Sequence, residues 1–382
     1  MRRTLPAVVA LLAACSLALA EDGAERFLLY RVERIEAAQA PTIDGVLDEP
    51  AWQERPALTS LRNFLGPLAG DLPTQRSEFV IMTDGPTVYI GATFHDGQMD
   101  ALAANPAAAP FWNDCTEIYL DPRHGGKVST QLTVDCLGQR FWQRRINEGA
   151  GWWDDTAWYI LAQWRVAVAR GESAWTIELA IDAASFDIDA SPGSVCGFNA
   201  CRFRLGAEAQ EFSAWGFAGR DRQKNLDAWG HLLFLAPGEE AGGEITRAEV
   251  EAVYGDLGER RIHVPVQGAF VVFTADDRQR VGFRELLEEA TDAARQQLAA
   301  AGEALDGLPA DDRRAEALRG QLPALEERAG ELLAAADAQE LTLGAHDRLS
   351  DELEAVRAEL HELTWQARVL ALAIAAREEA QG

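Results

Sequence analysis

The residues of this 382-residue chain best suited to chemistry lie in one short stretch, residues 111–122, Phe-Trp-Asn-Asp-Cys-Thr-Glu-Ile-Tyr-Leu-Asp-Pro. From Asp114 to Asp121 apolar and polar side chains alternate, which predicts a half-buried β-strand that carries Glu117 outward, with Trp112 at its entrance. An indole beside a strand-borne carboxylate offers stacking and hydrogen bonds, the two contacts that a flat sugar-binding surface needs. A core Trp that closes one end of a β-sandwich fits the same pattern, and the stretch alone leaves both interpretations open.

A second carboxylate, Asp135, falls on the next expected strand, residues 129–136. Glu117 and Asp135 form a candidate pair across adjacent strands, the kind that glycoside hydrolysis needs at roughly 5–10 Å. Such pairs also form ordinary hydroxyl-binding surfaces. The sequence contains no His-Glu-x-x-His motif, phosphate-binding loop or nucleophile elbow. We therefore expect a binding protein rather than an enzyme, with a glycosidase as the weaker alternative.

A glycine-rich loop at residues 149–155 carries further aromatic and acidic side chains. Adjacent Trp152 and Trp153 cannot both point into one core, because successive strand residues face opposite ways. At least one of them is expected on the surface as a sugar-stacking ring, although packing under the loop fits equally well. Asp154 and Asp155 could bind a structural Ca²⁺ beside carbonyl groups, but we favour a solvated acidic loop. We expect no other cofactor or metal.

Charge and the N-terminus restrict the location and the partners of the protein. The formal net charge is −26 and the sequence pI is about 4.6, so no basic surface exists to bind nucleic acid. Arg2 and Arg3 precede an apolar run that ends at Ala18-Leu19-Ala20, which predicts a signal peptide at residues 1–20. The alternative is a lipobox, Leu12-Ala13-Ala14-Cys15, with Cys15 lipidated. No other apolar run is long enough for a membrane span, so we expect a secreted, periplasmic or cell-envelope protein.

Four cysteines follow the leader: Cys115, Cys136, Cys196 and Cys201. An even number in an oxidising compartment suggests disulfides. Strand parity places Cys136 and Cys196 on apolar faces and Cys115 and Cys201 on polar faces, which favours the pairs 115–201 and 136–196. Four free thiols are the alternative.

Tryptophan separates the chain into two parts, since ten of the eleven lie between Trp52 and Trp229. Residues 27–236 read as short strands divided by Gly- and Pro-containing turns, which predicts an antiparallel β-sandwich or jelly roll. The expected strands are 78–83, 88–95, 115–120, 129–136, 164–169, 175–181, 197–204 and 230–235. Residues 237–283 are expected to form a linker and a small β appendage with strands 261–266, 269–273 and 279–283, while residues 245–254 are ambiguous.

Residues 284–382 predict an α-helical region. Apolar residues there recur at alternating intervals of three and four, which is a heptad seam: Leu349, Leu353, Val356, Leu360, Leu363, Ala367, Leu370 and Ile374. Gly307-Leu308-Pro309 and Leu343-Gly344 divide the region into about three helices, and Pro323 kinks or restarts the second. We expect a helical hairpin or three-helix bundle, with self-association as a coiled coil as the alternative. In either case this half is a stalk or a docking element.

Residues 38–236 resemble the family 9 carbohydrate-binding modules, a group of DOMON-like β-sandwiches. The resemblance rests on three motifs that occur in the family's order. They are Pro41-Thr42-Ile43-Asp44-Gly45 with Trp52, the stretch from Trp112 to Pro122, and Trp175-Thr176-Ile177-Glu178-Leu179 followed by Gly197-Phe198-Asn199 and Trp229-Gly230-His231-Leu232.

The resemblance implies binding of sugar chain ends between two aromatic rings, with polar groups on the hydroxyls. Trp112 falls on the first ring position, Glu117 on a polar contact, and Gln131 just before two further contacts. There the family has a basic residue and an amide, whereas this chain has Thr133 and Asp135. The second ring position falls on Gln223, which is not aromatic, so Trp152 or Trp153 would have to replace it.

Together these features predict an exported, non-catalytic carbohydrate-binding protein that serves polysaccharide breakdown of the xylan or cellulose type. Trp112, with Trp152 or Trp153, would stack on sugar rings, and Glu117, Gln131 and Asp135 would bind hydroxyls. The alternative is a structural or interaction protein that works through the helical stalk and keeps the sandwich as a scaffold without sugar affinity.

Overall fold

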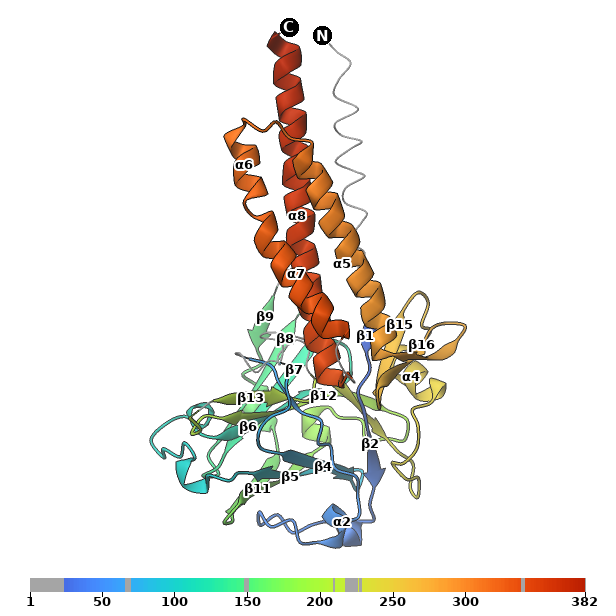
Figure 1. The fold of residues 1–382 in the computed structure, drawn as a ribbon. Coiled ribbons are helices and arrows are strands. Elements are labelled where there is room, and N and C mark those ends of the chain that lie inside the picture. The colour runs from blue at the N-terminus through green and yellow to red at the C-terminus, as the bar shows by residue number, and fades with distance from the viewer. Residues whose placement is uncertain are drawn as a thin grey trace.

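Alternating strands such as Cys115–Asp121 have one apolar face, and the protein buries these faces against each other between two layers of a curled sheet. The computed structural model describes residues 24–65, 70–147, 151–208, 210–216, 226, 229–337 and 341–381. Within them one 13-stranded sheet forms the sandwich, a four-stranded sheet lies beside it, and four helices rise from one side (Figure 1).

The large sheet turns from one layer into the other at β2 (Leu29–Arg34), which pairs in parallel with β4 on one side and with β14 on the other. The first layer follows the order β10 (Trp164–Arg170), β11 (Ala174–Asp182), β5 (Thr87–His95) and β4 (Ser77–Thr83). The second layer follows the order β14 (Gly230–Phe234), β12 (Val195–Arg204), β6 (Cys115–Asp121), β7 (Val128–Asp135), β8 (Arg140–Asn147) and β9 (Trp152–Asp154), with β13 (Glu211–Ala214) and β3 (Arg62–Asn63) beside β12. Neighbouring strands within each layer are antiparallel, and only the two pairings made by β2 in this described sheet are parallel.

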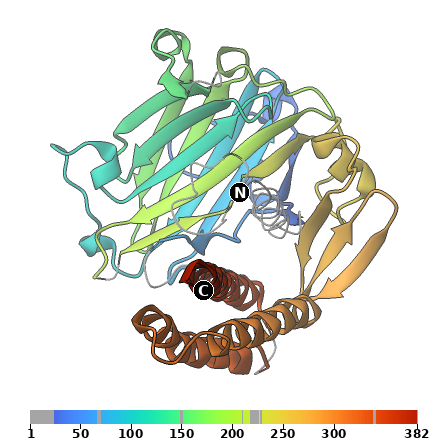
Figure 2. The same ribbon diagram turned by 90° about the horizontal axis from the view of Figure 1, so that it is seen from above.

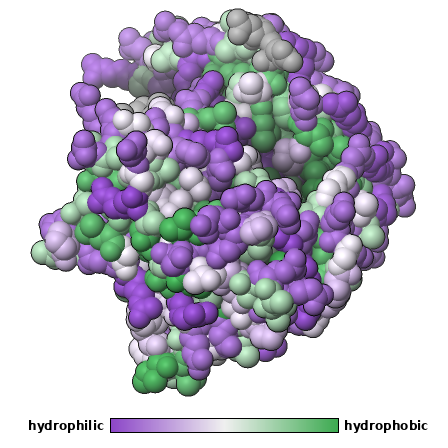
Figure 3. Space-filling model, turned by 90° about the horizontal axis from the view of Figure 1, so that it is seen from below, coloured by the Kyte–Doolittle hydropathy of each residue, from purple (hydrophilic) through white to green (hydrophobic). Residues whose placement is uncertain are grey.

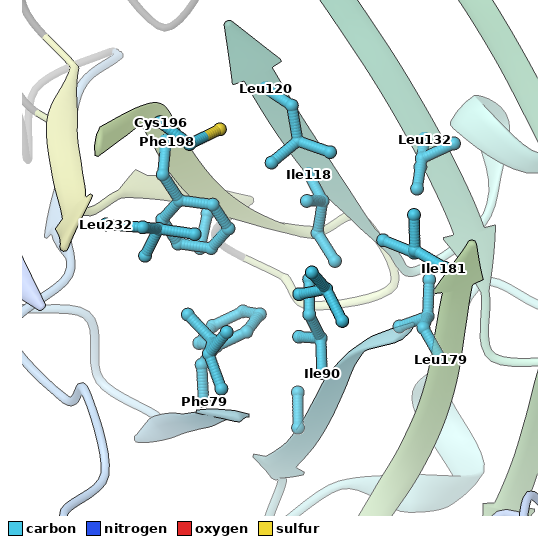
Figure 4. Packing of buried hydrophobic residues seen from close by; sticks show 14 of the residues in the cluster. Phe79, Ile90, Ile118, Leu120, Leu132, Leu179, Ile181, Cys196, Phe198 and Leu232 are labelled. Carbon is cyan, nitrogen blue, oxygen red and sulfur yellow. The ribbon is translucent and has the colours of Figure 1, made fainter. Parts of the chain in front are cut away.

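The core of the sandwich is apolar and closely packed. Ile118 and Leu120 of β6 point from the second layer toward Ile90 and Leu179 of the first (Figure 4). All four side chains are fully buried. Burial of this kind is the main stabilising term in a domain of this size.

A buried carboxylate joins two of the sequence motifs. Glu178 Oε1 accepts a hydrogen bond from the Trp52 indole at 2.9 Å, and Oε2 accepts from the backbone N–H groups of Asp44 at 2.8 Å and Gly45 at 2.6 Å. Gly45 has a φ of 95°, and a Cβ there would lie 2.7 Å from the Val168 carbonyl carbon, so the turn requires glycine. Burial raises the pKa of Glu178, whereas its N–H donors stabilise the ionised form.

The region after the sandwich forms a second, smaller sheet. Its strands are β15 (Arg261–Val266), β16 (Ala269–Phe273) and β17 (Arg278–Gly282), close to the three expected. The N-terminal β1 (Ala24–Arg26) pairs in parallel with β15, which the sequence did not indicate because three residues carry no readable period. The ambiguous segment is a helix, α4 (Arg247–Tyr254), whose N-cap Thr246 and Glu249 form a capping box.

The helices form a bundle within one chain. They are α5 (Phe283–Asp306), α6 (Arg313–Arg319), α7 (Leu322–Asp337) and α8 (Leu343–Gln381). The predicted seam is filled by α5 and α7, and Leu353, Val356 and Leu360 are fully buried there. Pro323 is the second residue of α7, so it restarts a helix rather than kinking one. No helix in the described ranges is long and apolar enough to cross a membrane.

Charged side chains fix the base of the bundle to the rest of the protein. Arg26 of β1 donates to both carboxylate oxygens of Asp347 on α8, at 2.5 and 2.6 Å, and Arg348 pairs with Asp71. Seen along the bundle, the helices stand at one side of the second layer, whose strands cross the view (Figure 2). From the opposite side the surface is largely hydrophilic, with hydrophobic side chains around one hollow and in separate smaller patches (Figure 3).

The structure contains neither predicted disulfide: all four cysteines are buried free thiols. Cys136 directly follows Asp135, which lies opposite Cys115, whereas Cys196 directly precedes Gly197, which lies opposite Asp121. These two thiols therefore lie at opposite ends of β6. Cys201 lies opposite Glu117 rather than Cys115, so the other pair is diagonal and exceeds disulfide reach. Strand parity predicted the faces correctly but not the positions along the strands.

A buried histidine links the sandwich to α4. His231 of β14 has its Nδ1 2.7 Å from His124 Nε2 and its Nε2 3.4 Å from the Tyr254 hydroxyl, and its ring packs on Phe27. Burial lowers the pKa of His231 to about 3, and the neighbouring His124 contributes in the same direction.

We predict that Glu178→Gln lowers the free energy of unfolding by about 2–4 kcal/mol, because an amide N–H₂ would then face backbone N–H donors. Urea unfolding followed by tryptophan fluorescence measures this change. Glu172→Gln, at an exposed position just before β11, is the matched control and should stay within about 0.5 kcal/mol of wild type. Equal stability of the two variants would contradict the role assigned to Glu178.

We also predict that stability falls as pH decreases from about 6.5 toward about 3. In this window the unfolded chain protonates His231 and the folded protein does not, so acid favours unfolding, by about 3 kcal/mol at pH 4. His231→Phe keeps a ring against Phe27 and should reduce the loss of melting temperature between pH 7 and pH 4. His361→Phe, on α8, is the control and should lose as much as wild type. The same loss in both variants would refute the assignment.

Candidate functional site

The outward face of the second layer brings together the polar residues that the sequence singled out. Residues directly opposite each other in antiparallel strands share a face. Tyr119 of β6 lies opposite Gln131 of β7, which lies opposite Gln143 of β8. The next row consists of Glu117, Thr133 and Phe141. The face therefore carries a row of polar groups beside a row that ends in an aromatic ring.

Hydrogen bonds connect the polar residues into a chain that runs toward the edge of the sheet. Glu117 Oε2 accepts from the Tyr119 hydroxyl, and Oε1 accepts from Gln131 Nε2 at 2.8 Å. Gln131 Oε1 in turn accepts from Gln143 Nε2 at 2.6 Å. Glu117 and Gln131 are only 6% and 5% exposed, whereas Gln143 is half-buried. Gln143 is thus the accessible end of a polar network whose other members are buried.

The Tyr119 hydroxyl sets the direction of the hydrogen bonds in this network. Burial and the adjacent Glu117 raise the pKa of the Tyr119 hydroxyl well above its ordinary value, so the hydroxyl stays protonated and donates. Glu117 therefore acts as an acceptor toward both of its neighbours. A network with fixed donors and acceptors holds Gln143 in one orientation.

One half of the outward face is covered and the other half is open. On the β12 side, Tyr119 packs against Trp229, their ring centroids 5.5 Å apart, and Phe64 and Cys201 complete a buried apolar cluster. On the other side, the outward residues of β8 are half-buried or exposed, from Phe141 to Asn147. The accessible surface is therefore a strip along β8.

Aromatic rings stand at the Phe141 end of this strip. Trp112 belongs to the short 3₁₀ turn Pro110–Trp112 before β6 and is 69% exposed, which excludes the interpretation of Trp112 as a core residue. Its ring contacts Phe111 edge-on with centroids 5.7 Å apart, and Phe111 contacts Phe141 at 5.9 Å. Sequence reasoning missed Phe141, because β8 was not expected to be a strand, and therefore also missed Phe111, whose ring contacts Phe141.

The two loop tryptophans point to opposite faces of the edge strand. Trp152 lies opposite Asn147 and so belongs to the outward face, where it is 41% exposed, whereas Trp153 lies opposite Ile146 on the other face. Phe141 and Asn147 are six residues apart along β8, or roughly 20 Å. Trp152 therefore cannot sandwich one sugar ring with Trp112, and Trp153 does not belong to this face. The other expected ring position, Gln223, lies outside the described residues.

Three predicted acidic ligands have structural partners instead. Asp135 is fully buried, accepting from the backbone N–H groups of Leu137 and Gln139 through Oδ1 and from Asn113 Nδ2 through Oδ2. Its expected role as a hydroxyl ligand is wrong in this structure, because Oδ1 holds the turn after β7 and Oδ2 holds the Asn113 side chain before β6. Asp154 pairs with Arg145 at 3.2 Å, and Asp155 accepts from the backbone of Trp158.

Asp154 and Asp155 therefore form no common oxygen cage for Ca²⁺. Over the ranges of the chain that the structure describes, no group of three His, Cys, Asp or Glu residues could hold a metal ion.

Comparison with known protein families identifies the sandwich. The family model described as "Carbohydrate family 9 binding domain-like" matches residues 43–235, just over half of the chain. The chain belongs to this family. The match runs from the Ile43-Asp44-Gly45 turn to the end of β14 and leaves the bundle outside. Membership in the carbohydrate family 9 binding domains supports a carbohydrate-binding role.

Two solved structures of a family 9 module from Caldicellulosiruptor kristjanssonii resemble the sandwich. One, in complex with cellotriose, is 15% identical and covers 57% of this chain and 100% of that chain, with a TM-score of 0.41. The other, in complex with glucose, is 14% identical and covers 56% of this chain and 100% of that chain, also with a TM-score of 0.41. No curated protein matches the chain.

We predict that Asp135→Asn lowers the free energy of unfolding by about 1–3 kcal/mol, because the new amide would point a donor at Asn113 Nδ2. Chemical denaturation tests this loss. Saccharide affinity of the folded variant should stay that of wild type, since Asp135 does not reach the strip. A loss of affinity without a loss of stability would contradict this assignment and show that Asp135 contributes to saccharide binding.

Proposed function

We propose that this family 9 domain is a non-catalytic module that binds a saccharide along the strip of β8. The observation that carries the proposal is the exposed Trp112 ring at one end of a strip on which a positioned amide, Gln143, is accessible. A pyranose has apolar C–H faces that stack on an indole and equatorial hydroxyls that need hydrogen-bond partners.

Gln143 is the residue to which we assign the sugar hydroxyls. One hydrogen of its Nε2 is used on Gln131, and its Oε1 and second hydrogen are the groups offered to the ligand. Glu117 and Gln131 act through Gln143, because they are almost fully buried and bonded to each other. A preorganised amide loses little side-chain entropy on binding, which raises affinity.

The length of the strip suggests an oligosaccharide. Phe141, near the Trp112 end, and Asn147, opposite Trp152, lie about 20 Å apart along β8, which is longer than one pyranose. We therefore assign Trp152 to a second stacking position at the far end of a longer ligand, rather than to a clamp around one ring. Arg145, exposed between them, adds donors on the same face.

The state of the carboxylates supports a binding role over hydrolysis. A glycosidase needs one carboxyl group as acid and one as base or nucleophile, both open to the substrate. Glu117 is engaged by Tyr119 and Gln131, and Asp135 by Asn113 and two backbone N–H groups. In the setting we propose, polysaccharide breakdown of the xylan or cellulose type, another chain would supply catalysis.

Export is part of the same proposal, since polysaccharides lie outside the cell. The predicted signal peptide and the lipobox with Cys15 lie outside the described residues. Either route would place the sandwich where it can meet its ligand.

We predict that Trp112→Ala weakens binding at least about fivefold, through lost stacking. Isothermal titration calorimetry should use glucose and cellotriose, the ligands of the two similar structures, and xylotriose. Trp365→Ala, at an exposed Trp on α8 (41% exposed), is the matched control and should bind as wild type does.

Two results would count against the proposal. Unchanged affinity in Trp112→Ala would move the site elsewhere. Failure of the folded wild-type protein to bind any of the three sugars, or longer oligosaccharides of the same types, would favour the sandwich as a scaffold.

A further inference from the structure

Helix α8 has an apolar stripe on the side that faces away from the bundle. Trp365, Val369 and Leu372 follow one another at intervals of four and three and are 41%, 43% and 57% exposed. Residues at these intervals lie on one face of a helix. The seam residues Leu363, Ala367 and Leu370 lie on the opposite face, buried against the bundle. We call Trp365, Val369, Leu372 and Ala376 the outer stripe.

The outer stripe runs through the least polar part of the helical region. Residues 369–376 read Val-Leu-Ala-Leu-Ala-Ile-Ala-Ala, with no charged residue, and only Leu370 and Ile374 among them are buried or half-buried. The C-terminal end of α8 continues past the ends of α5 and α6 (Figure 1). A contiguous apolar surface on a chain with a net charge of −26 indicates an interaction site.

We propose that the outer stripe pairs with the same stripe of a second copy of this chain, with the two α8 helices antiparallel. A twofold contact needs a surface that is complementary to itself. Antiparallel pairing can place Trp365 against Ala376 of the partner copy and Val369 against Leu372. Large residues then meet small ones at the ends and two aliphatic residues meet at the centre, which is how helix interfaces pack.

Charge at the ends of the stripe fits this register. Glu362 precedes the stripe and Arg377 follows it, both exposed. In the proposed register Arg377 of one copy lies about half a helical turn, measured along the helix axis, from Glu362 of the other. The twofold symmetry repeats this pair at both ends of the contact. The pairs are opposite in sign and solvent-exposed, so they select the antiparallel register more than they add affinity.

The net charge also favours antiparallel over parallel pairing. Two copies carry −26 each and repel at short range. The 39-residue α8 spans roughly 58 Å at 1.5 Å per residue, and antiparallel pairing keeps the sandwiches at opposite ends of it. That separation exceeds several Debye lengths, which are about 8 Å at physiological ionic strength. Parallel pairing would set the two acidic sandwiches side by side.

The contact is small, so the dimer is weak. Four stripe residues per helix bury less than the roughly 800 Å² per partner of a standard interface, which indicates a micromolar dissociation constant. Such a dimer forms when copies are concentrated, for instance on one polysaccharide. Two binding faces in one particle then bind with avidity. This inference stands on the outer stripe alone and does not require saccharide binding.

Sedimentation velocity tests the proposal on the chain from Glu21 onward, which lacks the predicted leader. We expect the weight-average mass to rise toward twofold between about 5 and 300 µM in the absence of sugar. The double variant Val369→Glu/Leu372→Glu should stay monomeric across this range. Ala371→Glu, an exposed position on the same turns but off the stripe, is the matched control and should dimerise as wild type does. Circular dichroism should show the same helix content in all three proteins.

Cysteine pairing tests the direction of the helices. An oxidised mixture of Val369→Cys and Leu372→Cys chains should give the mixed disulfide in excess over either homodimer, because the register sets position 369 of one copy against position 372 of the other. The four native thiols are buried and should not compete. A monomeric wild type at 300 µM, or a dimer that survives the double Glu substitution, would overturn the proposal. An excess of Val369–Val369 homodimer would overturn the antiparallel register.

Discussion

The register of β6 between β7 and β12 is the constraint on which the rest of the sandwich depends. With Ile118 opposite Leu132 and Ala200, the apolar side of β6 enters the core and the side with Glu117 and Tyr119 faces outward. A shift of one residue would put the carboxylate in the core and the aliphatic residues outside. Because side-chain direction alternates, the strand that closes the core also positions the outward network. Stability and the candidate site therefore have the same origin.

The outward network shows how a buried carboxylate is tolerated in such a fold. Glu117 is nearly inaccessible, yet the Tyr119 hydroxyl and the Gln131 amide satisfy its two oxygens. Burial of an unpaired charge would cost far more than these bonds contribute in water. The result is a rigid chain of groups that ends at Gln143 beside exposed rings. Glu178 repeats this solution on the first layer, where a sealed carboxylate holds the turn at Gly45.

The sequence predicted much of the fold because its local signals agree with the final packing. The alternation in residues 115–120, 175–181 and 197–204 gave strands whose ends differ from β6, β11 and β12 by one or two residues. The heptad seam of α8 likewise became a buried stripe. Trp112 was correctly expected at the entrance of β6, since a Pro-initiated turn precedes an alternating strand. The family motifs predicted the β-sandwich fold as a whole.

The rest depended on contacts that no local pattern encodes. Strand β8, with three arginines, has no clean alternation, so Phe141 and Gln143 were not recognised as site residues. Disulfide pairs and the role of Asp135 depend on position along neighbouring strands, which parity alone does not give. Trp152 and Trp153 were rightly expected to diverge, but only the pairing of β9 with β8 shows which of them shares a face with Gln143.

A crystal structure of the protein with a bound cello- or xylo-oligosaccharide tests the central claim most directly. The account predicts one pyranose stacked on the Trp112 indole, hydroxyls within hydrogen-bond distance of the Gln143 amide, and further sugar units along β8 toward Trp152. Density for the ligand on another surface, with the strip of β8 empty, would contradict it.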